Sequence, residues 1–206
     1  YELQFLGYVG NVFSVKDIEI AEQKGALVDL DQVHLGTQKS LGIDPGFRHA
    51  GFVVTEWVNE QISVVYAEET ENADVDDLVD LTLSLISKYN ISQLNNCNIY
   101  IDGSDIDFCK KLKQMVGEDT NYERQIDLLK KSLKDNYNLR RLRENMFVIP
   151  IHFGQEHKQM LTHTKTVLEY NGGTVAIHPS LTKLTTALRS ATEKGDIMSL
   201  DKDKTS

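Results

Sequence analysis

The sequence predicts an α/β fold in which one mixed sheet carries helices on both of its faces. Two observations support this prediction. Residues 40–44, 51–57 and 62–67 are rich in β-branched and aromatic residues and are joined by short connections, which is typical of a three-stranded antiparallel meander. Beyond residue 74, segments whose apolar residues recur at helical spacing alternate with short apolar strands. This alternation adds parallel strands to the meander and places helices over the sheet.

The later elements are predicted from caps, periodicity and turn residues. Asp74 and Asp105 each precede apolar residues at helical spacing, so each side chain can cap a helix. The triplet Asn-Gly-Gly at 171–173 supplies a left-handed helix end. The predicted helices cover residues 15–24, 75–86, 106–116, 122–143, 155–170 and 181–191, and the later strands cover 98–102, 146–151 and 174–177.

Composition is that of a globular protein with one core. The chain has 206 residues, of which 40% are hydrophobic and 26% charged. No apolar run approaches the roughly 18 residues that a membrane helix needs. Cys97 and Cys109 have the spacing of neither a CxxC pair nor a zinc site, and we expect buried free thiols in a reducing compartment. Trp57, at a strand end, is expected in the core.

Charge is distributed unevenly along the chain. The formal net charge of −9 argues against a protein that coats DNA tightly, but not against an enzyme that meets DNA briefly. Residues 110–143 contain ten basic and five acidic residues, a local net charge of +5. Arg140, Arg141 and Arg143 could hold backbone phosphates. A solvated helix face explains the same pattern.

Two predicted strands end in an aspartate that a turn follows. Asp44 closes an apolar strand and precedes Pro45-Gly46, and Asp102 closes the strand 98–102 and precedes Gly103. Either aspartate alone could be a turn residue that bonds its own backbone. If the two strands are parallel neighbours, however, the carboxylates lie about one strand spacing apart on one rim. Two anions at that distance repel each other unless a cation lies between them.

Hard divalent cations with oxygen ligands suit such a pair, and Mg²⁺ or Mn²⁺ is the expected ion. Two such ions activate a water and stabilise the leaving oxygen when a phosphodiester is hydrolysed. The sequence therefore predicts that Asp44 and Asp102 form a catalytic metal site. His49, just after the first acidic turn, could contact phosphate or be an ordinary turn histidine.

The segment Gly42-Ile43-Asp44-Pro45-Gly46 resembles the first strand of the ribonuclease H-like superfamily, which includes Holliday-junction resolvases. The rest of the chain resembles the nuclease domain of viral large terminase subunits. The segments that carry this second resemblance are 1–6, 11–14, 99–103, 148–153 with Lys158, Met160 and Leu161, and 172–178 with Leu181 and Leu184.

The resemblance implies a ribonuclease H-like fold and two of the family's three metal-binding carboxylates, at Asp44 and Asp102. The third is expected from an Asp-rich helix after the last strand, and Asp196, Asp201 and Asp203 are the weak candidates within this chain. The expected organisation is a lead-in from a packaging ATPase domain at 1–39 and a nuclease domain at 40–206, which stops before that helix. No GxxxxGK[ST] phosphate loop occurs in the sequence.

The implied function is cutting of concatemeric viral DNA during genome packaging, in the cytoplasm of an infected host. The implied partners are double-stranded DNA, the N-terminal packaging ATPase domain, the portal and the small terminase subunit, with no membrane. Two alternatives stay open: a Holliday-junction-resolvase-like nuclease, and a ribonuclease H-like docking module without activity. An actin-like or sugar-kinase ATPase needs a second domain of the same kind, for which 206 residues are too few.

Overall fold

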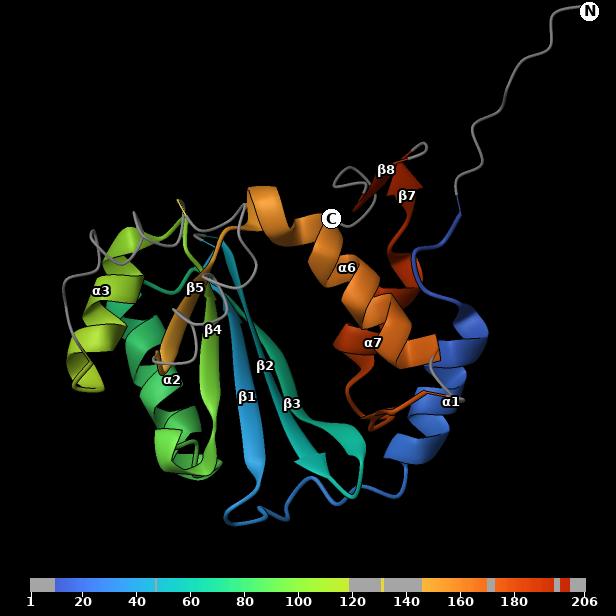
Figure 1. Ribbon diagram of the computed structural model, residues 1–206, viewed down its shortest axis with the longest axis horizontal. Coiled ribbons are helices and arrows are strands. Elements are labelled where there is room, and N and C mark those ends of the chain that lie inside the picture. Colours follow the sequence, from blue (N-terminus) through green and yellow to red (C-terminus); the bar gives the residue numbers. More distant parts are fainter. Residues whose placement is uncertain are drawn as a thin grey trace, which may run out of the picture.

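A six-stranded mixed sheet forms the centre of the molecule, with helices on both sides (Figure 1). The computed structural model describes residues 10–46, 48–118, 131, 146–169, 173–194 and 197–200. The strands of the sheet follow the order β5-β4-β1-β2-β3-β6. The strands are β1 (Gln38–Asp44), β2 (His49–Val58), β3 (Gln61–Glu71), β4 (Asn98–Asp102), β5 (Val148–Ile151) and β6 (Val175–Ile177).

Strand pairing confirms the predicted topology. The strands β1, β2 and β3 form an antiparallel meander, and β4 joins β1 in parallel. Two further parallel pairs, β4 with β5 and β3 with β6, complete the sheet. Parallel neighbours need crossovers, and the helices between these strands supply them.

The helices separate into two layers. On one face lie α2 (Val75–Lys88) and α3 (Ile106–Met115), and on the other lie α1 (Val15–Gly25), α6 (Phe153–Glu169) and α7 (Thr182–Ser190) (Figure 1). Each layer has its own hydrophobic cluster. The α/β fold with helices on both faces is therefore confirmed.

Part of the predicted lead-in packs into this body. Val12, Phe13 and Ile18 are buried in the cluster that α6, α7 and β6 also form, and Lys39 lies in β1. Gly25, at the end of α1, approaches β6 so closely that an added Cβ would lie 2.1 Å from the carbonyl of Ile177. The structure thus shows that the described residues of 1–39 pack directly on the domain.

Several boundaries differ from the sequence predictions. The meander strands are longer than predicted, because hydrogen bonding continues into polar residues near the turns. Two elements were not predicted, the 3-10 turn η1 (Gln93–Asn95) and the hairpin of β7 (Glu193–Lys194) and β8 (Ile197–Leu200). The expectation that Trp57 is a core residue is wrong, because its side chain is 47% exposed near the end of β2. The predicted helix 122–143 lies, apart from Lys131, outside the described residues.

Asp74 caps α2 as the sequence predicts. Its carboxylate accepts hydrogen bonds from the backbone N–H groups of Asp76 and Asp77, and the Asp77 side chain accepts from the Asp74 N–H. This capping box satisfies backbone donors that the first helical turn leaves unpaired.

Replacing Asp74 by alanine should therefore lower the free energy of unfolding by about 1 kcal/mol, since N-cap deletions typically cost that much. Urea denaturation followed by circular dichroism measures the difference. The exposed Asp80→Ala substitution in the interior of α2 provides the matched control and should leave stability nearly unchanged.

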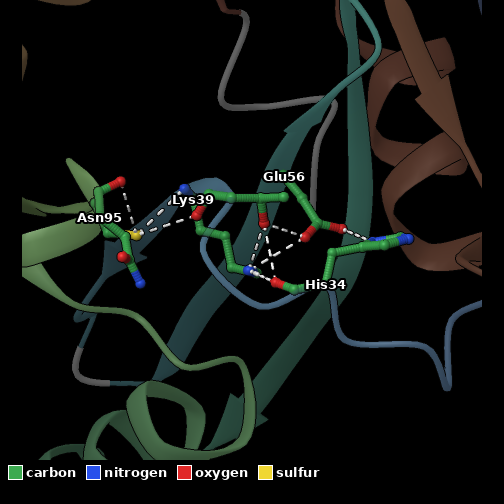
Figure 2. Close-up of polar contacts among 6 residues, drawn as sticks. His34, Lys39, Glu56 and Asn95 are labelled. Atoms are coloured by element: carbon green, nitrogen blue, oxygen red, sulfur yellow. Dashed lines mark hydrogen bonds and ion pairs between the residues drawn. The ribbon is translucent and has the colours of Figure 1, made fainter.

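A buried ion pair anchors the start of β1 (Figure 2). The side chains of Lys39 and Glu56 are 1% and 2% exposed, and their Nζ and Oε1 atoms lie 3.1 Å apart. Thr37 donates its hydroxyl to Glu56 over 2.5 Å, and His34 Nδ1 lies 2.8 Å from the other carboxylate oxygen. Lys39 also donates to the Thr37 hydroxyl and the His34 carbonyl.

Burial raises the pKa of Glu56, but the hydrogen bonds from Thr37 and His34 and the Lys39 charge outweigh it, so the pKa lies below its ordinary value. The carboxylate is therefore held ionised inside the protein. This network lies at the end of β1 opposite to Asp44 and ties β1 to β2.

A second carboxylate sets the start of β5. Glu118 accepts hydrogen bonds from the backbone N–H groups of Phe147 and Val148, and it pairs with the fully buried Lys113 of α3 over 3.0 Å. These contacts hold β5 against α3 and thereby fix its register beside β4.

Candidate metal centre at the ends of β1 and β4

The pairing of β1 with β4 brings Asp44 and Asp102 together. Gly42 pairs with Tyr100 and Ile43 with Ile101, so the next residue of each strand stands beside the other at the sheet edge. Residues that face each other across parallel strands point to the same side, and neighbouring strands are about 4.8 Å apart. The prediction that these strands are parallel neighbours with adjacent carboxylates is confirmed.

The turn after β1 sets the position of the first carboxylate. After Asp44 the chain reverses at Pro45-Gly46, where an added Cβ on Gly46 would lie 2.4 Å from the His49 carbonyl oxygen. Only glycine therefore fits this turn without moving the backbone. Asp44 is exposed at the surface beside this turn.

The second carboxylate is held by its own loop. The Ser104 N–H donates to Asp102 Oδ1 over 3.0 Å, and the Gly103 N–H donates to the Ile151 carbonyl. A Cβ on Gly103 would lie 3.2 Å from the Pro150 Cβ and 3.3 Å from the Ile151 oxygen. Gly103 thus permits the close approach of β5, and the same loop fixes the orientation of Asp102.

The strand register extends the site across the sheet. Asp44 pairs with Gly51 of β2, and Gly51 pairs with Glu69 of β3, so Asp102, Asp44 and Glu69 share one face. Gly51 places no side chain between Asp44 and Glu69. The Glu69 carboxylate lies 3.1 Å from His49 Nδ1, and both side chains are about half exposed.

An apolar groove adjoins the two aspartates. It has a volume of about 250 Å³ and runs from Asp44 and Asp102 down the sheet face that α6 covers. Its other lining residues come from β1, β2, β4, β5 and α6: Gly42, Ile43, Gly51, Val53, Tyr100, Ile101, Ile151, Phe153 and Met160.

The donor chemistry of the two aspartates suits a hard divalent ion, because carboxylate oxygens are the ligands that Mg²⁺ and Mn²⁺ prefer. Among the described residues, no group of three or more His, Cys, Asp or Glu side chains is placed to share one ion. Asp196, Asp201 and Asp203, the candidates for a third ligand, lie outside the described residues. The described part of the site therefore offers a pair of ligands.

The structure also places the remaining predicted residues. Cys97 and Cys109 are buried free thiols, as expected. His49 pairs with Glu69 at the edge of the site, whereas Arg140, Arg141 and Arg143 lie outside the described residues. No helix in the described part of the chain has the length and apolar character to cross a membrane.

Sequence reasoning missed Glu69 and the groove residues Tyr100, Phe153 and Met160. Alternation along β4 could have placed Tyr100 on the face of Asp102, since the two are separated by one residue. The contributions of β3 and α6 depend on packing between distant segments, for which the sequence carries no local signal.

The topology and the paired strand-end acids define the class: this is the ribonuclease H-like fold, with an antiparallel meander extended by parallel strands and covered by helices. More particularly, it is the fold of the nuclease domain of phage large terminases. The terminase nuclease of thermophilic phage G20c with bound magnesium matches with a TM-score of 0.56 over 88% of this chain and 80% of that chain, at 15% identity. The expected resemblance is confirmed in the fold.

Two further structures match to the same degree. The large terminase nuclease domain of Thermus phage P74-26 has a TM-score of 0.55, at 15% identity over 88% of this chain and 78% of that chain. The large terminase of another thermophilic bacteriophage has a TM-score of 0.56 at 11% identity over 89% of this chain, which spans only 37% of that longer protein. No protein-family model matches the chain, and no curated protein matches it by sequence.

Proposed function

We propose that this chain is the nuclease domain of a viral large terminase, which hydrolyses DNA phosphodiesters with divalent metal held by Asp44 and Asp102. The register of β1 and β4 carries this proposal, because it puts two carboxylates side by side on one face. The fold shared with phage terminase nucleases supports it. Structures of the G20c nuclease contain magnesium or cobalt, which supports dependence on a divalent ion.

In the proposed mechanism, Asp44 contacts two ions and Asp102 completes one of the two sites. When bound, the ions supply an activated water and stabilise charge on the leaving oxygen. The Ser104 N–H holds the Asp102 carboxylate in one orientation, so little order has to be gained when a ligand binds. A third acid from outside the described residues would complete the second site.

The biological setting follows from the same proposal. The substrate is concatemeric double-stranded viral DNA, cut during packaging in the host cytoplasm. The partners are a packaging ATPase domain joined through residues 1–39, the portal and the small terminase subunit. Because the chain carries a net charge of −9, we expect weak intrinsic affinity for DNA and a need for these partners to present it.

Cleavage of supercoiled plasmid by the chain with millimolar Mg²⁺ or Mn²⁺ tests this function. We expect nicked and linear products that disappear with a chelator, and a loss of more than about 100-fold in rate for Asp102→Asn, since even indirect changes to metal ligands cost 10–100-fold. A four-way junction should be cut no faster than a linear duplex of equal length.

Two outcomes contradict the terminase proposal. Symmetric cleavage of the four-way junction in preference to the linear duplex would favour the resolvase-like nuclease. An absence of cleavage, together with no heat of Mg²⁺ or Mn²⁺ binding in calorimetry, would favour the docking module without activity.

A further inference from the structure

The groove beside the two aspartates is apolar although it lies on a charged rim. Asp44 and Asp102 stand at one end, and the surface below them is lined by Tyr100 and Val53 from the sheet and by Met160 from α6. Tyr100 and Met160 are each 37% exposed, so neither is consumed by core packing. A site that bound only phosphate and metal would have no use for such a surface, because both ligands require polar groups.

The groove is hollow because of a glycine at its centre. Gly42 pairs with Tyr100 on one side and with Val53 on the other, so all three share the face of Asp44. An added Cβ on Gly42 would meet only the Val53 carbonyl oxygen, at 3.9 Å. The missing side chain therefore leaves a recess between Tyr100 and Val53, while α6 places Phe153 and Met160 against the same recess.

The recess is at the right distance from the acids for a nucleotide. Tyr100 and Asp102 are separated by one residue on β4, which corresponds to about 6.6 Å along the strand. A phosphate held at Asp44 and Asp102 is joined to a base through a single sugar, so the attached base reaches the level of Tyr100. An aromatic ring with one exposed face is the surface on which an isolated base stacks.

We propose that this groove binds the base of an unpaired nucleotide next to the scissile phosphate, with the base stacked on Tyr100 and flanked by Met160. This inference rests on the proposed nuclease function and names its substrate: a DNA strand that is locally unpaired at the cut. In an intact duplex the faces of the bases are covered by their neighbours, so stacking on Tyr100 requires the nucleotide to leave the helix. Unstacking costs a few kcal/mol, and stacking on the protein offsets part of it.

Binding in an inactive background tests this inference without metal or cleavage. The parent for the test is the Asp44→Asn/Asp102→Asn double variant, which removes the two charges that repel DNA and prevents hydrolysis. Fluorescence anisotropy with a labelled oligothymidylate should show that Tyr100→Ala weakens binding by about 5- to 140-fold, the equivalent of 1–3 kcal/mol for one stacked base. Tyr100→Phe, which keeps the ring, should bind within about twofold of the parent.

Two controls make the result specific. Trp57→Ala removes an exposed aromatic ring near the other end of β2 and should leave binding unchanged. A blunt duplex of the same length should bind equally to the parent and to Tyr100→Ala. Irradiation of an oligonucleotide with one 5-iododeoxyuridine should crosslink the base to Tyr100, as mapped by mass spectrometry of the peptides.

Equal single-strand affinity of the parent and Tyr100→Ala would overturn the inference, as would crosslinks confined to residues outside the groove. These failures are distinct from failure of the proposed function. Metal binding and plasmid cleavage by the chain with Tyr100 intact report on Asp44 and Asp102, and they can succeed when base stacking is absent.

Discussion

The Asp44→Asn variant is expected to lose more than about 100-fold in affinity for Mg²⁺ and Mn²⁺, and to lose cleavage with it. Changes to groups behind a ligand already cost 10–100-fold, and Asp44 is proposed to contact the ions directly. Asp44 stands between Asp102 and Gly51 in the row across the sheet, so its carboxylate is central to the site. Calorimetry with Mn²⁺ and the plasmid assay measure the two losses.

The two aspartates should not be equivalent. Because Asp44 is proposed to contact both ions and Asp102 one of them, Asp102→Asn should retain part of the heat of binding that Asp44→Asn loses. The exposed Asp80→Asn on α2, behind the opposite face of the sheet, is the matched control for removing one negative charge. Undiminished metal binding or cutting by Asp44→Asn would remove the proposed site altogether.

Replacement of Lys39 by methionine is expected to have the largest effect on stability, a loss of about 3–5 kcal/mol, because it leaves the Glu56 carboxylate buried without its cation. For a chain of this size the loss corresponds to a fall in Tm on the order of 10 °C. Urea denaturation at neutral pH measures it. Lys16→Met, on the exposed surface of α1, should leave the stability nearly unchanged.

A double-mutant cycle identifies the cause of that loss. In the Glu56→Gln background, Lys39→Met should cost less by at least about 1 kcal/mol, because no buried charge is left unpaired. Acid provides a second readout. Since the pKa of Glu56 is lowered from 4.5, the stabilisation is present above that pH and is lost as the pH falls through the lower folded-state value. Equal costs of Lys39→Met in both backgrounds would contradict the buried-pair explanation.

The elements of the fold were predictable wherever the signal was local. The capping box of Asp74, the cap at Asp105 and the alternation in the meander each depend on residues a few positions apart. The two central strands, β1 and β4, were placed to within two residues for the same reason. The β7–β8 hairpin escaped prediction because its strands are short and lack a two-residue Asn-Gly or Asp-Gly turn between alternating residues.

The prediction for Trp57 failed for a related reason. Hydrophobicity favours burial, but whether a strand-end residue is covered depends on which helix reaches it, and the side chain is left 47% exposed. Conversely, Lys39 and Lys113 are charged and yet fully buried, because Glu56 and Glu118 neutralise them. Composition carries no information on such pairs, since their partners lie on other elements.

By itself, the sequence determined that Asp44 and Asp102 each close an apolar strand and precede a turn, because strand ends and turns are specified by neighbouring residues. Only the tertiary structure decided that the two strands are parallel neighbours in a register that aligns those ends. It also decided that Gly42 and Gly51 empty the surface beside them, and that Tyr100 and Met160 face the space so formed. Register and packing join residues far apart in the chain, and the free energy that selects them comes from the whole core.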